Sequence, residues 1–373
     1  MENKQINIIA FTIPYPPTYG GVIDVFYKIK ALYEAGVEIY LHCFLYDREQ
    51  NVELEKYCKK IYYYPRKKAL FSAFGYKPYI VQSRKLKPLL ENLLNNDYPI
   101  LFEGLHTCGF LNHSALNKRK KIVRPCNIEH LYYKGLGKDE KNIFKKIYFF
   151  IESIRLKHFE KQLQYAQYLL AISNLDTTHF QDVFPNTKVY YLPAFHAVSK
   201  VVCQKGKSDY ILFHGDLSVS SNIEVVHYIV ENIALNSPHR FVIAGRKPTL
   251  KLKKMLAKTK NIELIESPST EEMDHWIRNA HIHLLLSFNL SGLKLKLLQS
   301  LFEGRFILCN SILVAGSGLE SYCHLAQTPQ EFKEKIEQLF LLEFDDKLVD
   351  ERFLLFKGVF SNSNNANTLK NLL

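Results

Sequence analysis

Two lysines at the start of a predicted helix are the residues of this sequence best suited to chemistry. An apolar run of strand length, His281–Ser287, is followed by Ser291-Gly292 and then by leucines at helical spacing that continue to Gly304. Lys294 and Lys296 therefore fall in the first turn of a helix. The free N–H groups and the dipole of that turn already supply positive charge, so two further cations indicate a bound anion, phosphate above all. The alternative is that both lysines only solvate a surface helix.

Length and composition place the chain among globular proteins of two domains. It has 373 residues, of which 47% are hydrophobic and 23% charged. No apolar run reaches the roughly 20 residues that span a bilayer, and the first residues lead directly into a strand, so we expect no signal peptide. The seven cysteines are scattered, without a Cys-x-x-Cys pair. We therefore expect a reduced, cytoplasmic protein without a structural metal.

The positive charge is concentrated in the first half of the chain. Residues 1–200 hold 29 Lys and Arg against 18 Asp and Glu, whereas residues 201–373 hold 20 against 19. A run over residues 59–71 mixes basic and aromatic side chains, which suits the headgroup layer of an anionic membrane. Single-stranded nucleic acid and a plain solvated face are the alternatives, and no nucleic-acid-binding motif occurs. The predicted membrane-surface residues are Lys59, Lys60, Arg66, Lys67 and Lys68.

Strands and helices alternate along the whole chain, which predicts an α/β protein with doubly wound parallel sheets. The pattern starts at Ile6–Ile13 and restarts at Tyr210–His214 after a polar segment. We therefore expect two Rossmann-like domains, residues 1–197 and 198–350, facing each other across a cleft. Residues 351–373 are expected to form a helical tail that packs back on the first domain, and the polar run Ser361–Asn367 within it suits a loop or frayed end.

The loop after the first strand is built for close approach to a ligand. The sequence from Pro14 to Gly21 contains three prolines and ends in the pair Gly20-Gly21, immediately before a helix. Glycines there allow backbone N–H groups to approach an anion. Neither the dinucleotide fingerprint G-x-G-x-x-G nor a Walker P-loop is present, so the usual dinucleotide and P-loop sites are excluded.

Six segments of the sequence resemble, in their order and spacing, the retaining GT-B glycosyltransferases of family 4, also called group 1. The N-terminal P-x-P-P-x-x-G-G loop resembles that of the family, as does the G-x-K-x-K helix from Gly292. Four shorter segments also fit the family: Phe102–His106, Arg124–His130, Ala171–Ser173, and Phe213–Asp216 with Asn222. The similarity extends over nearly the whole chain.

The resemblance implies transfer of a sugar from a UDP- or GDP-linked donor to a glycan or lipid-linked acceptor, with retention of configuration and without a metal or other cofactor. It implies a hexosyltransferase of class EC 2.4, active in surface polysaccharide or glycoconjugate synthesis in the cytoplasm, with peripheral association at the inner face of the membrane. His106 and Lys294 are implied as catalytic residues. The acceptor side would include Arg124, Asn127 and Glu129. The donor would be bound by Gly20, Gly21, Gly215, Arg246, Ser291, Gly292, Lys294, Lys296 and Gln299.

Two positions depart from the family pattern. Members usually carry a pair of glutamates across the G-x-K-x-K helix, and the corresponding residues here are Ser291 and Gln299. Gln299 can accept a hydrogen bond from a ribose hydroxyl but loses the stronger charge-assisted bond. Two alternatives therefore remain beside an active transferase. One is a catalytically weakened GT-B binding or partner subunit, and the other is a non-hydrolysing nucleotide-sugar epimerase.

Overall fold

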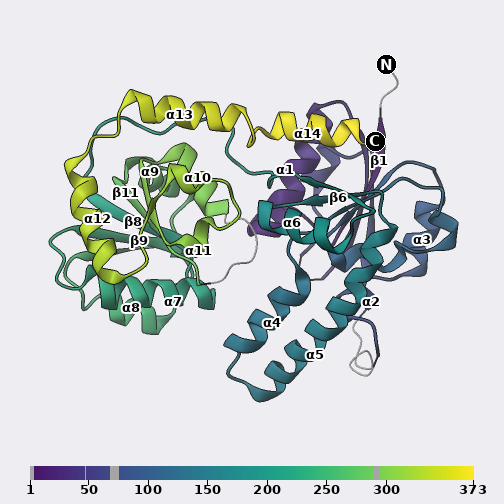
Figure 1. Ribbon diagram of the computed structural model, residues 1–373, viewed down its shortest axis with the longest axis horizontal. Helices are drawn as coiled ribbons and strands as arrows, with labels where there is room; N and C mark the ends of the chain where they lie inside the picture. Colours follow the sequence, from purple (N-terminus) through teal and green to yellow (C-terminus); the bar gives the residue numbers. More distant parts are fainter. Residues whose placement is uncertain (1–3, 47, 68–74, 289–294) are drawn as a thin grey trace. The chain divides into compact units, whose positions relative to one another are not determined.

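The computed structural model describes residues 4–46, 48–67, 75–288 and 295–373. These residues form two compact units. Of the described residues, unit 1 contains 4–46, 48–67, 75–196 and 359–373, and unit 2 contains 197–288 and 295–358. Each unit is built on a parallel sheet with helices on both faces (Figure 1). In the described residues the sheets have seven and six strands.

The sheet of unit 1 has the strand order β3-β2-β1-β4-β5-β6-β7, with every pairing parallel. Its strands are β1 (Gln5–Ala10), β2 (Glu38–Leu45), β3 (Lys60–Pro65), β4 (Ile100–Glu103), β5 (Lys121–Arg124), β6 (Tyr168–Ala171) and β7 (Lys188–Tyr191). Its helices are α1 (Gly20–Glu34), α2 (Tyr79–Gln82), α3 (Lys87–Leu93), α4 (Glu129–Asp139), α5 (Ile143–Glu160), α6 (Asn174–Val183) and α14 (Asn362–Asn371). The order reverses between β1 and β4, which are neighbours in the sheet although two strands come between them in the sequence.

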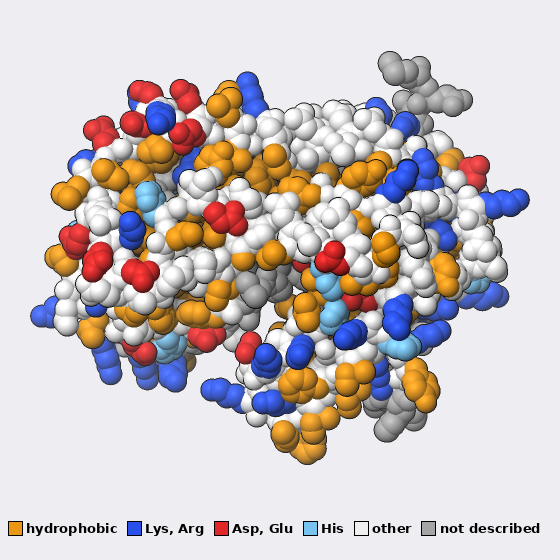
Figure 2. All heavy atoms as spheres, in the orientation of Figure 1, with side chains coloured by type: hydrophobic (Ala, Val, Ile, Leu, Met, Phe, Trp, Pro, Cys, Tyr) orange, Lys and Arg blue, Asp and Glu red, His pale blue; other side chains and the backbone are white. Residues whose placement is uncertain are grey.

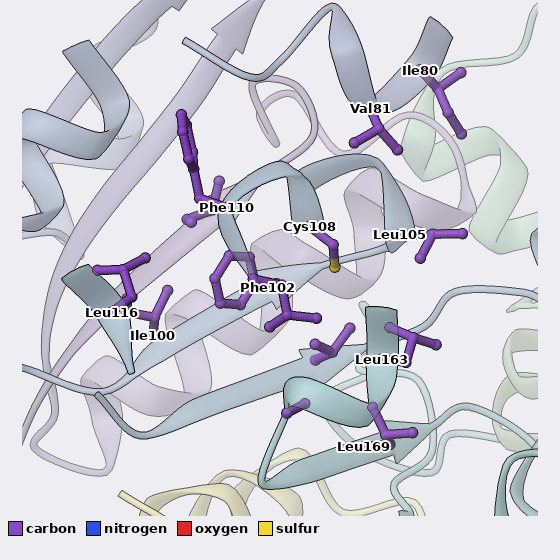
Figure 3. Close-up of a cluster of buried hydrophobic side chains, with 14 of the residues drawn as sticks. Ile80, Val81, Ile100, Phe102, Leu105, Cys108, Phe110, Leu116, Leu163 and Leu169 are labelled. Atoms are coloured by element: carbon purple, nitrogen blue, oxygen red, sulfur yellow. The ribbon is translucent and has the colours of Figure 1, made fainter. Parts of the chain in front are cut away.

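Two apolar layers cover the faces of this sheet. One layer joins the inward residues of β1 to α1 and α14, which lie side by side in Figure 1. The other layer packs helices α3, α5 and α6 against β4 and β5, and Figure 3 shows its centre around Phe102, Leu105 and Cys108. Strands buried on both faces explain why their sequences are continuous apolar runs and not alternating ones.

The sheet of unit 2 has the order β10-β9-β8-β11-β12-β13, again parallel throughout. Its strands are β8 (Tyr210–Asp216), β9 (Arg240–Arg246), β10 (Ile262–Glu266), β11 (Ile282–Leu285), β12 (Phe306–Cys309) and β13 (His324–Leu325). Its helices are α7 (Ser220–Tyr228), α8 (Leu250–Leu256), α9 (Thr270–Asn279), α10 (Leu295–Glu303), α11 (Ser311–Val314), α12 (Pro329–Leu341) and α13 (Asp346–Lys357). Here the order reverses between β8 and β11.

The prediction that Ser361–Asn367 is a loop or frayed end is wrong. These residues begin helix α14, whose N-cap is Ser361, with its hydroxyl accepting from the backbone N–H of Asn364. Ala366 and Leu369 are buried against unit 1. Tertiary packing of two apolar side chains and a good N-cap outweigh the poor helix propensity of a run of asparagines.

Candidate functional site

Parallel sheets bind ligands outside the carboxyl ends of their strands, at the point where the strand order reverses. In unit 1 that point lies after β1 and β4, and in unit 2 after β8 and β11. The structure places Gly20 and Gly21 after β1, His106 after β4, and Gly215 as the last residue but one of strand β8. Residues predicted from sequence therefore lie at the reversal point of each sheet.

His106 is the central polar residue at the reversal point of unit 1. It belongs to a short 3-10 helix, Leu105–Phe110, that follows β4 through Gly104 at φ 71°. Its ring centroid lies 5.7 Å from that of Phe11, which follows β1, and its Nδ1 lies 3.9 Å from Oε1 of Glu129. Burial lowers the pKa of His106 to about 3, with help from the charges of Arg84 and Arg66. The imidazole is therefore neutral at pH 7 and can donate from one nitrogen and accept at the other.

Glu129 beside it is a carboxyl group held in its neutral form. It is the first residue of α4 and is almost fully buried. Burial raises its pKa to about 8, and the negative charges of Glu160 and Asp176 also raise it. The hydrogen bond from Asn127 and the charge of Arg84 have the opposite, smaller effect. A protonated Glu129 can donate a hydrogen bond as well as accept one. Of the three predicted acceptor-side residues, Glu129 thus lies next to His106, and Asn127 is hydrogen-bonded to Glu129.

Arg84 completes this cluster and is a site residue that the sequence analysis did not predict. Its guanidinium is buried and donates to the backbone oxygens of Phe11 and Ile80, both at 2.7 Å. Burial and the charge of Arg66 lower its pKa to about 10. Among the described residues no carboxylate forms a salt bridge with it, so the carboxyl end of this sheet carries a buried cation that is held by backbone oxygens.

Gly21 permits the close packing at this point of unit 1. A Cβ atom at Gly21 would lie 2.8 Å from Cζ of Phe11, which is closer than side chains tolerate. Because Phe11 packs on His106, a side chain at position 21 would displace the ring that supports the histidine. The neighbouring Gly20 is the first residue of α1. Gly21 is therefore required by the packing, whatever part the glycine pair has in binding.

Arg124 was predicted to lie on the acceptor side, but the structure buries it in contacts that hold unit 1 together. Its guanidinium is fully buried and forms a two-pronged ion pair with Asp24, with both N–O distances 3.0 Å. It also donates to the backbone oxygens of Leu170, Leu192 and Pro193. All these partners are internal to unit 1, so the side chain cannot reach a substrate.

Lys296 is the described lysine of the G-x-K-x-K helix, and its head group is positioned by two residues of unit 2. Its Nζ lies 3.4 Å from Oδ1 of Asn222 and 4.9 Å from the ring centroid of Phe213 in β8. Asn222 in turn donates to the backbone oxygen of Asp216 at 2.9 Å. A Cβ at Gly215 would lie 3.2 Å from Asn222. The lysine is therefore held in the first turn of α10, over the carboxyl end of β8.

Helix α10 is anchored to the sheet by buried histidines. A ring nitrogen of His214 lies 3.0 Å from the hydroxyl of Ser300, and burial lowers the pKa of His214 to about 3, so this ring is neutral. A Cβ at Gly304 would lie 1.9 Å from Nε2 of His283, so only glycine fits where the helix ends. These contacts fix the direction of the helix that carries Lys296.

Arg246 and Gln299 face partners within unit 2. Arg246, half exposed at the end of β9, forms an ion pair with Asp216 at 3.3 Å. Gln299 donates from Nε2 to Glu303 at 3.1 Å, and burial raises the pKa of Glu303. Arg246 thus lies at the carboxyl end of the sheet, and Gln299 lies on α10. Ser291, Gly292 and Lys294 fall outside the described residues, so the structure gives no account of them.

The predicted membrane-surface residues do not form one patch. Lys59 and Lys60 lie at edge strand β3, with Lys59 4.0 Å from Glu38 and Lys60 4.8 Å from the ring of Tyr62. Lysines are common on edge strands because they discourage pairing with another chain. Lys67 is exposed and Lys68 lies outside the described residues.

Arg66 in particular belongs with the polar cluster of unit 1. Its guanidinium lies between the rings of Tyr46 and Tyr79, at 4.2 and 5.1 Å. Its Nε donates to Ser83 at 3.1 Å, and its charge contributes to the lowered pKa of His106. The contacts of this side chain in the structure are therefore with residues of unit 1.

Within the described ranges, His, Cys, Asp and Glu side chains nowhere gather in groups of three that could hold a metal ion. The helices of the same ranges include none that is both long and apolar enough to cross a bilayer.

The fold is that of GT-B glycosyltransferases. TarM of S. aureus, crystallised with UDP, superposes with a TM-score of 0.66 at 10% sequence identity over 99% of each chain. Alr3699/HepE of Anabaena, in complex with UDP and glucose, gives 0.66 at 9% identity over 98% of each chain. A glycosyltransferase from Rickettsia africae gives 0.65 at 14% identity, over 100% of this chain and 98% of that one. The match rests on the two parallel sheets flanked by helices, which have seven and six strands in the described residues.

The chain belongs to the family of an uncharacterized 44.6 kDa protein in the cps region of Klebsiella pneumoniae. The two sequences are 30% identical over 339 residues, which is 84% of each chain. The sequence matches no protein-family model.

Proposed function

We propose that this protein is a retaining glycosyltransferase of the family 4 type that takes a UDP-linked sugar as donor. Its acceptor is a glycan or a lipid-linked glycan, and its product belongs to a surface polysaccharide or glycoconjugate. The observation that carries the proposal is the positioned Lys296 in the first turn of α10, in a chain whose fold neighbours hold UDP. The cps-region relative supports a role in polysaccharide synthesis.

Unit 2 is proposed to hold the nucleotide. When the sugar leaves, negative charge grows on the β-phosphate of UDP, and a fixed cation with free helix N–H groups stabilises that charge. Lys296 supplies the cation, while Asn222 and Phe213 fix its position before the donor binds. Lys294 remains a predicted second cation. We propose that this charge stabilisation proceeds without a divalent metal.

Unit 1 is proposed to hold the acceptor. A neutral His106 can hydrogen-bond a sugar hydroxyl without adding positive charge. The protonated Glu129 can likewise donate to a hydroxyl. Arg84, which lacks a carboxylate partner among the described residues, suits a phosphate of a lipid-linked acceptor.

A catalytically weakened binding subunit is the second candidate, and Gln299 favours it. The side-chain amide of Gln299 donates a hydrogen bond to Glu303 in the same helix. A side chain held in this way is less available to a ribose hydroxyl than the usual glutamate. Such a chain would bind nucleotide without turning it over.

Release of UDP from a panel of UDP-sugars, with GDP-sugars for comparison, tests the proposal. We expect turnover with at least one UDP-sugar, in buffer containing EDTA as in buffer containing Mg²⁺, and an NMR spectrum that shows retention at the anomeric carbon. Lys296→Met should reduce turnover about 100-fold, in the range found when one charge-stabilising donor is removed. Nucleotide binding without turnover of any donor would favour the weakened subunit, and absence of nucleotide binding would refute both candidates.

A further inference from the structure

The outward face of helix α5 is apolar over most of its length, which is unusual for a surface helix. At 100° per residue one face collects the solvent-exposed apolar side chains of α5. We call them the α5 stripe: Ile143, Phe144, Ile147, Tyr148, Ile151 and Ile154. Phe144 is 80% exposed and Ile154 is 71% exposed. A surface helix normally turns polar residues outward, so the stripe indicates a partner with an apolar surface.

Helix α5 packs against unit 1 through its opposite face, so the stripe is not needed to hold the helix in place. Glu152, Ser153, Leu156 and Glu160 are buried on that face. The Ser153 hydroxyl donates to the backbone oxygen of His130 in α4 at 2.7 Å, which joins the two helices as a hairpin.

Basic side chains surround the stripe. Residues 131–157 hold seven Lys and Arg against three Asp and Glu, and one of these acids, Glu152, is buried and paired with Arg155 at 2.8 Å. Figure 2 shows hydrophobic and Lys or Arg side chains together over the hairpin, at the bottom of the view. Exposed lysines lie on both helices and on the turn between them: Lys134, Lys138, Lys141, Lys145 and Lys157.

A basic pocket of about 360 Å³ lies at the carboxyl end of the same helix face. Its lining includes Lys77, Lys85, His113 and His158, and no carboxylate. His158 follows Ile154 by four residues, so pocket and stripe are neighbours on α5. Burial lowers the pKa of Lys85, and the nearby charge of Lys77 acts in the same direction. Two lysines close enough to repel each other favour an anion between them.

We propose that the α4–α5 hairpin docks unit 1 onto an anionic membrane. The α5 stripe enters the boundary between headgroups and acyl chains, the lysines contact anionic headgroups, and the basic pocket holds a lipid phosphate. From Ile143 to Ile154 the stripe is about 16 Å long, which suits a helix lying in the plane of the interface. The charge around the stripe selects a lipid leaflet over an apolar protein surface. This docking site does not depend on the donor chemistry proposed above.

Flotation of the full-length protein with vesicles tests the proposal. Vesicles of phosphatidylcholine alone are compared with vesicles that also contain phosphatidylglycerol. We expect the wild type to bind the anionic vesicles. The variant Ile147→Ser/Ile151→Ser should bind them with at least tenfold lower affinity. In the pocket variant Lys77→Gln/Lys85→Gln, the affinity for anionic vesicles should fall about fivefold for each lysine removed.

Two control variants match these changes elsewhere on the surface. Leu250→Ser/Leu341→Ser removes two exposed apolar side chains of unit 2, and Lys59→Gln/Lys60→Gln removes two lysines of the edge strand. Both should bind anionic vesicles as the wild type does. If the lysine control loses as much as the pocket variant, binding depends on overall charge and the pocket assignment is wrong.

Three further results would overturn the docking proposal. The first is a wild-type protein that does not bind anionic vesicles. The second is a stripe variant that retains lipid binding but changes from dimer to monomer in light scattering, because the stripe would then be covered by a second copy. The third is a stripe variant that melts at a lower temperature than the leucine control without lipid, because the stripe would then be packed within the chain.

Discussion

Replacing Asp24 by asparagine should destabilise unit 1 strongly, because the carboxylate is the centre of a buried network of four charges. Asp24 accepts from Arg124 and, at 3.0 Å, from Lys28. Lys28 also donates to both oxygens of Glu103, at 2.7 and 2.9 Å. All four side chains are at most 2% exposed. In Asp24→Asn, two buried cations would share the single charge of Glu103.

The expected loss in the free energy of unfolding is about 3 kcal/mol, the lower end of the range for removing one partner of a buried pair. We choose the lower end because the charge of Asp24 raises the pKa of Glu103, and its removal makes that carboxylate easier to ionise. With a urea dependence of roughly 3 kcal/mol per M, the midpoint should fall by about 1 M. Far-UV circular dichroism during urea unfolding measures this shift.

The same variant should lose an acid-sensitive part of its stability. Against the effect of burial, the charges of Arg124 and Lys28 hold the pKa of Asp24 well below its usual value. A carboxylate with a depressed pKa stabilises the fold above its unfolded pKa near 3.9, and the contribution is lost as the pH falls below that value. Wild-type stability should therefore drop between about pH 5 and pH 2, and Asp24→Asn should show a shallower drop.

Glu53→Gln, which removes the exposed ion pair with Lys56, is the matched control and should change little. A midpoint in Asp24→Asn that moves no further than in this control would refute the structural role of the network. An altered KM for acceptor with unchanged stability would instead return Arg124 to the acceptor side.

Three further changes probe other contacts. Glu129→Gln should raise the unfolding midpoint more at pH 8 than at pH 5, since a raised pKa costs stability as the pH rises from the unfolded value toward about 8; equal shifts at both pH values would contradict the buried neutral carboxyl. His106→Ala should lower kcat about 100-fold with little change in the melting temperature, and an unchanged kcat would exclude the ring from the reaction. Gly245→Ala should cost about 3 kcal/mol because its Cβ would lie 1.9 Å from the oxygen of Gly215, whereas Gly135→Ala, with open space around it, should gain about 1 kcal/mol; similar unfolding midpoints for the two variants would contradict the close strand contact.

The parallel sheets were predictable because their strands are apolar runs separated by helical patterns. The run His281–Ser287, for example, contains β11 (Ile282–Leu285) with one or two extra residues at the ends. Strand β3 was missed because its sequence, KIYYYP, is a tyrosine run between basic residues, which favoured a surface segment over a strand. An edge strand buries little, so its composition carries a weak signal.

The candidate site could be predicted only where local sequence carries the information. The glycines and His106 follow strands, so topology brings them to the reversal points. Arg124 and Asp24 are 100 residues apart, and a buried ion pair between them leaves no local pattern. Arg84 was missed as a site residue for the same reason, since its burial comes from the packing of distant segments.

Titration of the protein with UDP tests the central claim most directly, namely that Lys296 and the first turn of α10 bind the diphosphate of a nucleotide donor. Isothermal calorimetry should show one UDP site, uridine should bind much more weakly, and Lys296→Met should raise the Kd for UDP about tenfold. Lys251→Met, on exposed helix α8, is the control and should leave the Kd unchanged. Equal affinities for UDP in wild type and Lys296→Met, or no binding of UDP at all, would contradict the account.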